Sequence, residues 1–354
     1  MTKNNADAIR WMRPALRASA QARGQTGSNP NVGVAHWRDN SLRQVCATAQ
    51  GGRPHAEAQL VDVQAGDVIA VTLEPCAHEG VTGSCAQFLI QRKPSLVVVG
   101  LIDPDSRTAG KGIAALEHAG ITVVTGVEEK DARYHMAGFL TRIQAQRPYV
   151  RLKVAMSKDG RTALPNGHSQ WITGEEARVH SHILRYEADA IMVGAITADR
   201  DKPSLTCRLG GHMLQPKIFV LQGRHSHGYM PDNAMSIGAG SDADITVPSD
   251  EEGYPNLKSS LNMLAKRGIN NLLVESGGAL AASFLRHQLV DELFIYQSPL
   301  ILGSECQPGI GPLGLRQLQM LDGMSLVEQR EVGRDMLCRY IFDHNAHATS
   351  LLRG

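Results

Sequence analysis

A histidine, a glutamate and two cysteines stand at spacings that suit a metal-dependent hydrolytic centre. His55 and Glu57 are separated by one residue, and Cys76 and Cys85 follow further along the chain. One imidazole and two thiolates are good ligands for Zn²⁺, and three protein ligands leave the fourth tetrahedral position open for water. Zinc lowers the pKa of that water toward about 7. We therefore predict a zinc ion bound by His55, Cys76 and Cys85, with Glu57 as the general acid and base.

This set of residues is that of zinc deaminases, in which the glutamate moves protons and is not a ligand. Cys76 and Cys85 are nine positions apart, which is longer than the commoner separation of three. Two other interpretations stay open at this point. His78 would be the fourth ligand of a closed, structural zinc site, or the chain binds no metal here. We favour the catalytic site and expect His78 to contact the substrate.

The elements predicted around these residues would bring them together. Pro54 is expected to open a helix that carries His55 and Glu57, since proline is favourable at the first helical position. The apolar run 67–73 indicates a buried strand that ends close to Cys76. A second helix is expected to begin at Cys85, where its N–H groups would favour an ionised thiolate.

Strands alternate with helices along the whole chain, which predicts an α/β fold with parallel or mixed sheets covered on both faces. The pattern is interrupted at Arg147-Pro148, so we predict two domains, 1–147 and 148–354. The segment 223–241, rich in Gly, His, Ser and Asn, is expected to be an exposed loop. We expect strands at 32–37, 67–73, 96–100, 121–125, 149–155, 190–194, 217–221, 271–274 and 292–297, with 339–342 closing the second sheet, and helices at 6–22, 112–119, 175–187, 257–266 and 277–287.

The composition argues against several classes of protein. The 354 residues carry a net charge of +1 and only 5% aromatic residues, which disfavours a nucleic-acid surface. No apolar stretch approaches the roughly 18 residues of a membrane span, and the N-terminus lacks the apolar core of a signal peptide. Six scattered cysteines do not indicate a disulfide framework. We expect a cytoplasmic protein that binds a small molecule and neither membrane nor nucleic acid.

A glycine-rich turn in the second half suits phosphate binding. Glu275-Ser276-Gly277-Gly278 joins a predicted strand to a predicted helix, whose first N–H groups can bind an anion. On spacing alone this signal is weak, because many strand-to-helix turns contain glycines. The turn does not match the Rossmann fingerprint.

The first half resembles the deaminase part of the bifunctional riboflavin-biosynthesis deaminase/reductase family, in which the long spacing between the two cysteines is typical. The resemblance implies a cytidine-deaminase-like, three-layer α/β/α domain. It also implies that Asn29, Asn31 and His78 contact a pyrimidine, although both asparagines also suit a turn. It is carried by Asn29-Pro30-Asn31-Val32-Gly33, by Pro54-His55-Ala56-Glu57, and by Thr72-Leu73-Glu74-Pro75-Cys76-Ala77-His78 with Cys85.

The second half resembles the reductase part of the same family through Lys153, Ser157, 159–160, 169–173, Arg185, 201–208 and 275–278. This implies a dihydrofolate-reductase-like α/β domain that uses NADPH. The family commonly has Asp-Asp-Pro where Asp201-Lys202-Pro203 stands, so we expect Lys202 to reverse one charge near the nucleotide. By position, the nucleotide would contact Ala155, Trp171, Thr197, Asp201, Gly277 and Gly278, and the ribose-phosphate substrate would contact Ser169, Arg185, Leu205, Arg208 and Glu275.

The resemblance implies a bifunctional, homodimeric enzyme of riboflavin biosynthesis. Its first activity would be zinc-dependent hydrolytic deamination of 2,5-diamino-6-(5-phosphoribosylamino)pyrimidin-4(3H)-one, and its second NADPH-dependent reduction of the ribosyl group to ribityl. No acid or base for the hydride step is evident from the sequence. The alternatives are a monofunctional deaminase with a degenerate reductase domain and a zinc-stabilised binding module without catalysis. A nucleic-acid deaminase is disfavoured by the composition.

Overall fold

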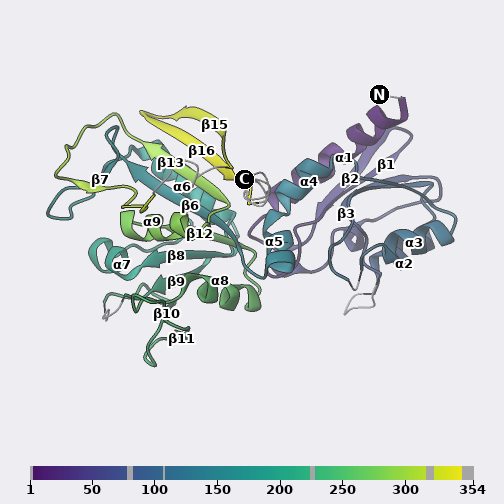
Figure 1. Cartoon of the computed structure of the whole chain (residues 1–354). Coiled ribbons are helices and arrows are strands. Elements are labelled where there is room, and N and C mark those ends of the chain that lie inside the picture. Colours follow the sequence, from purple (N-terminus) through teal and green to yellow (C-terminus); the bar gives the residue numbers. More distant parts are fainter. Residues whose placement is uncertain (1–2, 78–82, 107, 224–227, 316–322, 345–354) are drawn as a thin grey trace, which may run out of the picture. The chain divides into compact units, whose positions relative to one another are not determined.

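The computed structural model describes residues 3–77, 83–106, 108–223, 228–315 and 323–344 (Figure 1). The chain divides into two compact units, Met1–Gln146 and Arg147–Gly354. His78, which was predicted to contact the substrate, lies outside the described residues. Within the described ranges no helix is both long and apolar enough to cross a membrane.

The first unit is built on a mixed five-stranded sheet in the order β2-β1-β3-β4-β5. The strands β1 and β2 form an antiparallel hairpin, β1 is also antiparallel to β3, and β3, β4 and β5 run parallel. The apolar strands β3 and β4 are buried along nearly their whole length, as expected for parallel strands covered on both faces. Their bounds are β1 Gly33–Arg38, β2 Ser41–Ala47, β3 Val68–Leu73, β4 Leu96–Leu101 and β5 Thr122–Thr125.

Helices cover both faces of this sheet (Figure 1). The helix α1 packs on β1 and β3 through Met12 and Leu16, which are buried. The two backbones approach so closely that a Cβ on Gly33 would lie 1.9 Å from the carbonyl oxygen of Ala15. Glycine is therefore required at the start of β1 for α1 to pack there. The helices are α1 Lys3–Gln21, α2 Cys85–Arg92, α3 Lys111–His118, α4 Glu129–His135 and α5 Ala137–Ala145.

The predicted helix after Pro54 is wrong. The segment after Pro54 forms only one short 3₁₀ turn, η2 Glu57–Gln59, which His55 precedes, and another 3₁₀ turn, η1 Gln50–Gly52, lies before the proline. The chain turns back into an extended conformation at Leu60, which is buried in the core. A 3₁₀ turn of three residues is enough to hold Glu57 close to His55, so a longer α-helix is not needed here. The helix predicted from Cys85 is confirmed as α2.

The second unit contains a nine-stranded sheet in the order β11-β10-β9-β8-β12-β6-β13-β16-β15. The strands from β11 to β13 run parallel, and β16 and β15 are antiparallel to their neighbours. The bounds are β6 Tyr149–Met156, β8 Ala190–Gly194, β9 Lys217–Leu221, β10 Ala234–Gly238, β11 Ile245–Thr246, β12 Asn271–Glu275, β13 Glu292–Gln297, β15 Met324–Val332 and β16 Asp335–Phe342, with a small separate sheet of β7 Arg161–Ala163 and β14 Gln307–Pro308.

Two predictions for this unit need correction. The segment 223–241 is not a loop throughout, because β10 lies within it and its Ser236 and Ile237 are buried against the core. The strand predicted at 339–342 belongs to β16 and is not the edge of the sheet. The edge strand is β15, which pairs with β16 and is largely exposed. The polar pattern of β15 is typical of an edge strand and gives little hydrophobic signal. The helices are α6 Glu175–Tyr186, α7 Ala195–Asp201, α8 Leu257–Lys266 and α9 Gly278–Arg286.

Candidate functional sites

In the first unit, three side chains converge at one point with the geometry of a metal site. The Nδ1 atom of His55 lies 3.8 Å from Sγ of Cys76 and 3.4 Å from Sγ of Cys85. All the ligand atoms of this trio lie within 4.8 Å of one another. In a tetrahedral zinc site with Zn–N near 2.0 Å and Zn–S near 2.3 Å, nitrogen and sulfur would be roughly 3.6 Å apart. The donor set and its spacing therefore fit a single zinc ion.

Each ligand comes from a different kind of element. Cys76 follows the carboxyl end of β3, and Cys85 is the first residue of α2. Ser84 is the N-cap of α2, and its hydroxyl accepts a hydrogen bond from the backbone N–H of Gln87. The backbone N–H of Cys85 points to Sγ of Cys76 at 3.4 Å. The helix start thus directs a donor at a thiolate, as the sequence predicted.

The two thiols are electrostatically coupled. The pKa of Cys76 is lowered to about 4, first because the Cys85 thiol donates a hydrogen bond to it and then because His55 does, although burial opposes the shift. The same contact and burial raise the pKa of Cys85. Without a cation the pair therefore keeps one proton, on Cys85. A bound zinc ion would remove that proton, because a coordinating thiol is deprotonated outright.

Glu57 lies beside this trio and is buried, with 3% of its surface exposed. Burial raises the pKa of its carboxyl to about 7, the nearby Cys76 thiolate adds to the shift, and a hydrogen bond with Cys85 opposes it. A carboxyl with a pKa near neutrality can both accept and return a proton. The position and burial of Glu57 suit the role of proton carrier.

The two asparagines of the predicted pyrimidine pocket are tied into the backbone of the first unit. The Nδ2 group of Asn29 donates to the carbonyl oxygen of Gly52, which belongs to η1. Asn31 is buried, and its Nδ2 group donates to the carbonyl oxygens of Ser19 and His135. Substrate contact by Asn29 and Asn31 remains a prediction.

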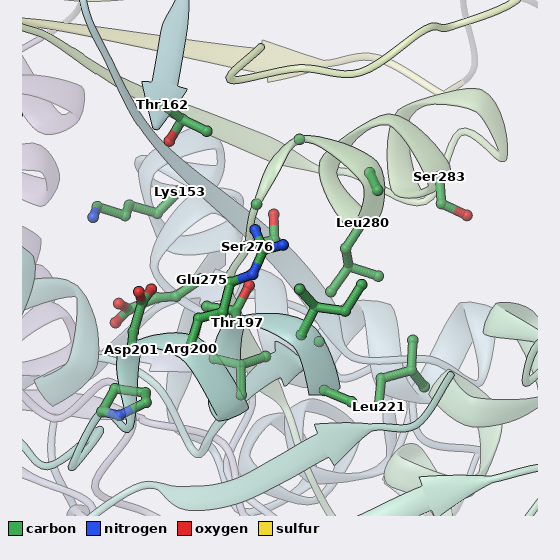
Figure 2. Close-up of a pocket in the computed structure, with 18 of the residues that line it drawn as sticks. Lys153, Thr162, Thr197, Arg200, Asp201, Leu221, Glu275, Ser276, Leu280 and Ser283 are labelled. Atoms are coloured by element: carbon green, nitrogen blue, oxygen red, sulfur yellow. The ribbon is translucent and has the colours of Figure 1, made fainter. Parts of the chain in front are cut away.

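In the second unit, a cavity of about 1470 Å³ is lined by every residue of this unit that was predicted to contact the substrate or the nucleotide. Its volume exceeds the 300–1000 Å³ typical of small-molecule sites, so it has room for a dinucleotide and a second ligand. Figure 2 shows part of its lining. The predicted residues in its wall are Ala155, Ser169, Trp171, Arg185, Thr197, Asp201, Leu205, Arg208, Glu275, Gly277 and Gly278.

The carboxyl ends of three adjacent parallel strands form the floor of this cavity. Ala155 lies near the end of β6, Gly194 ends β8, and Glu275 ends β12. Parallel α/β sheets bind ligands at this edge because the connecting loops diverge there. The cavity therefore follows from the strand order of the sheet.

The glycine-rich turn after β12 leads into a helix whose first N–H groups have no side-chain cap. Gly277 is the N-cap of α9, and no side chain caps the helix there. A Cβ on Gly278 would lie 2.2 Å from the carbonyl oxygen of Pro308, whereas one on Gly277 would only touch Oγ1 of Thr197 at 3.6 Å. Gly278 is thus needed for close packing, and the uncapped helix start suits a phosphate group.

The charged groups deep in the cavity form a cluster. Arg185 on α6 makes a bidentate ion pair with Glu275, with nitrogen–oxygen distances of 2.6 and 3.0 Å. This pairing and the nearby Lys153 keep the pKa of Glu275 low despite its burial. Leu205 borders the cavity but is buried in a hydrophobic cluster of the unit, and its φ of 52° is a left-handed conformation.

Lys153 is a candidate catalytic residue to which the sequence assigned no role. It lies on β6 and lines the cavity (Figure 2). Burial lowers the pKa of its ammonium group, an effect that Glu275 opposes and Arg185 reinforces. The signal in the sequence was a lysine within the otherwise buried strand Tyr149–Met156.

Lys202 does not lie where the sequence predicted. It is absent from the residues that line the cavity, whereas its neighbours Asp201 and Pro203 are present. Lys202 is the C-cap of α7 with a φ of 41°, and its ammonium nitrogen lies 6.0 Å from the ring centre of Tyr229.

Comparison with known proteins places both units in one family. A family model described as the RibD C-terminal domain matches residues 148–338. The riboflavin biosynthesis protein RibD of Bacillus amyloliquefaciens is 32% identical over 348 residues, covering 92% of this chain and 94% of the relative. A structure of Acinetobacter baumannii RibD matches 96% of this chain and 100% of its own length, with a TM-score of 0.86 and 31% identity.

A third similar protein is from Thermotoga maritima, with a TM-score of 0.84 and 28% identity over 96% of this chain and all of its own. It is described as a diaminohydroxyphosphoribosylaminopyrimidine deaminase/5-amino-6-(5-phosphoribosylamino)uracil reductase. The fold and the two separate sites thus define a two-domain α/β enzyme. The chain belongs to the RibD family of riboflavin-biosynthesis proteins. The predicted family and fold class are confirmed.

Proposed function

We propose that this chain catalyses two successive steps of riboflavin biosynthesis, a zinc-dependent deamination in the first unit and an NADPH-dependent reduction in the second. The observation that carries the proposal is the convergence of His55, Cys76 and Cys85 beside the buried carboxyl of Glu57. The substrate is taken from the name of the Thermotoga maritima relative, a diaminopyrimidine that carries a phosphoribosylamino group.

In the first unit, His55, Cys76 and Cys85 would hold the zinc ion. When bound, zinc supplies a water molecule activated for attack on the amino-bearing carbon of the pyrimidine. Glu57 accepts a proton from that water and passes it to the amino group, which leaves as ammonia. The burial of Glu57 beside the three ligands places its carboxyl where this proton transfer occurs.

In the second unit, the turn at Gly277 and Gly278 would hold the nucleotide phosphates at the start of α9. Bound NADPH supplies the hydride that reaches C1′ of the ring-opened ribose. Lys153 donates the accompanying proton to the nitrogen on C1′, so that hydride and proton together reduce one carbon–nitrogen double bond. Its lowered pKa makes the ammonium a better acid than an exposed lysine.

A coupled assay on the purified chain tests the proposal, with ammonia release and NADPH oxidation followed separately. Glu57→Ala should reduce ammonia release at least about 100-fold while one zinc ion per chain is retained. Unchanged ammonia release in this variant would contradict the mechanism.

The same assay separates the two alternatives. A monofunctional deaminase would release ammonia and bind NADPH without oxidising it in the presence of the deaminated substrate. A zinc-stabilised binding module would retain zinc and release no ammonia in the intact chain. A homodimeric state and a cytoplasmic location remain predictions, which analytical ultracentrifugation and cell fractionation would check.

A further inference from the structure

Arg200 is a cation of the second-unit cavity that has no part in the mechanism above. It lies on the last turn of α7, is exposed, and lines the cavity. Among the described residues no carboxylate lies within ion-pair distance of its guanidinium. The nearest polar contact is the side-chain oxygen of Gln307, 3.5 Å from Nη1, which is too long to hold the group firmly.

The guanidinium reaches across the cavity from α7. Its Nη1 atom lies 3.2 Å from the Cβ position of Gly167, a residue of the loop that follows β7. Gly167 has a φ of 88°, and a side chain there would displace the arginine. In Figure 2 the Arg200 side chain extends from α7 in the direction of Ser276, on the turn before α9.

The same face of α7 is in contact with the glycine-rich turn. Thr197 and Arg200 are three residues apart, so they lie on one face of the helix. Oγ1 of Thr197 lies 3.6 Å from the Cβ position of Gly277. Arg200 therefore lies about one helical turn after Thr197, the residue of α7 that is next to the start of α9.

We propose that Arg200 binds the pyrophosphate of the dinucleotide, opposite the uncapped start of α9. The inference rests on the proposed reductase function and names a residue that holds the cofactor. The two phosphate groups of the pyrophosphate would accept hydrogen bonds from the backbone N–H groups of α9 on one side and from the planar guanidinium of Arg200 on the other. This fork can donate two parallel hydrogen bonds to phosphate oxygens.

Three other arginines of the cavity are engaged elsewhere, and a fourth, Arg286, lies at the far end of α9, away from the helix start. Arg185 pairs with Glu275 and donates to the carbonyl oxygen of Thr206. Arg208 donates to the hydroxyl of Ser204, four residues earlier in the same loop. Arg178 donates to the carbonyl oxygen of Thr173 and lies over the ring of Trp171. Arg200 has no comparable contact and is available to a ligand.

The test measures Kd for NADPH and for NADH with the intact chain and with Arg200→Met. Methionine keeps an unbranched apolar stem and a similar helix propensity but removes the charged guanidinium. Because both dinucleotides carry the pyrophosphate, each Kd should rise about tenfold and their ratio should stay constant. Arg200→Lys, which keeps the charge without the fork, should recover part of the loss.

The matched control is Lys202→Asn, two residues away on the same helix end and outside the cavity wall. Asparagine tolerates the left-handed backbone at this position, and both Kd values should stay within about twofold. An increase in Kd for NADPH alone would place Arg200 on the 2′-phosphate. An increase only in KM for the deaminated substrate would place it on the substrate phosphate. Either result, or unchanged Kd values, overturns the inference, whereas failure of the intact chain to bind NADPH would instead overturn the proposed reductase function.

Discussion

Replacement of Lys153 by methionine should abolish reduction and leave deamination intact. Lys153→Met keeps an unbranched side chain of similar volume on β6 and removes the ammonium. The ion pair between Arg185 and Glu275 stays complete, so the variant leaves no unpaired buried charge in that pair. The variant should therefore fold, with a melting temperature close to that of the intact chain.

The size of the effect follows from the lack of a substitute donor near Lys153. Glu275 is held ionised by Arg185, and the hydroxyl of Tyr296 is occupied by His180 at 2.6 Å. Loss of a general acid costs about 100-fold to 10 000-fold in rate, or about 3–5 kcal/mol in the barrier. We expect kcat for NADPH oxidation to fall at least about 100-fold, while Kd for NADPH and the rate of ammonia release stay constant.

The pH profile provides a second readout. Proton donation requires the ammonium form, and burial lowers the pKa of Lys153 below its ordinary value of 10.5. The reductase rate of the intact chain should therefore be constant below that lowered pKa and fall as the pH rises through it. The residual rate of Lys153→Met should lack this alkaline limb.

The control is Lys158→Met, which removes an exposed lysine just beyond β6 and should leave both rates unchanged. Another titratable side chain in the wall is His182, whose Nδ1 accepts the backbone N–H of Arg208. If Lys153→Met retained more than about a tenth of the rate and His182→Asn did not, the assignment of the proton to Lys153 would be wrong.

Two further predictions concern the metal and the stability of the second unit. Cys85→Ser should lower the zinc content well below one ion per chain and stop ammonia release, whereas Cys338→Ser, outside the cluster, should retain both, as measured by elemental analysis and the ammonia assay. Asp291→Ala should lower the free energy of unfolding by about 3 kcal/mol in urea titration, because it leaves Arg147 without its partner; Glu129→Ala, which removes an exposed ion pair with Arg133, should cost less than about 1 kcal/mol. The pKa of Asp291 is depressed by Arg147 against the effect of burial, so its contribution is complete above its ordinary pKa of 3.8 and is lost as the pH falls through the lower folded value. A urea midpoint of Asp291→Ala equal to that of the intact chain at pH 7 would refute this account.

The sequence alone singled out the residues of the first candidate site and predicted the main strands of both units. His55, Glu57, Cys76 and Cys85 could be assigned because zinc chemistry restricts ligand type, and residue type is visible in the sequence. Long apolar runs such as 190–194 and 217–221 predicted buried strands correctly, because a parallel strand covered on both faces has little polar surface. The helix predicted after Pro54 failed because a proline start is equally compatible with a single 3₁₀ turn.

Only the tertiary structure decided which charged side chains reach the second cavity. Arg200 and Lys202 are two residues apart and look interchangeable in the sequence, yet Arg200 lines the cavity, whereas Lys202, the left-handed C-cap of α7, is not among the lining residues. The depressed pKa of Lys153 depends on burial beside Arg185 and Glu275, which come from different elements. Such effects depend on distances between segments far apart in the chain, and the order of strands in the sheet sets those distances.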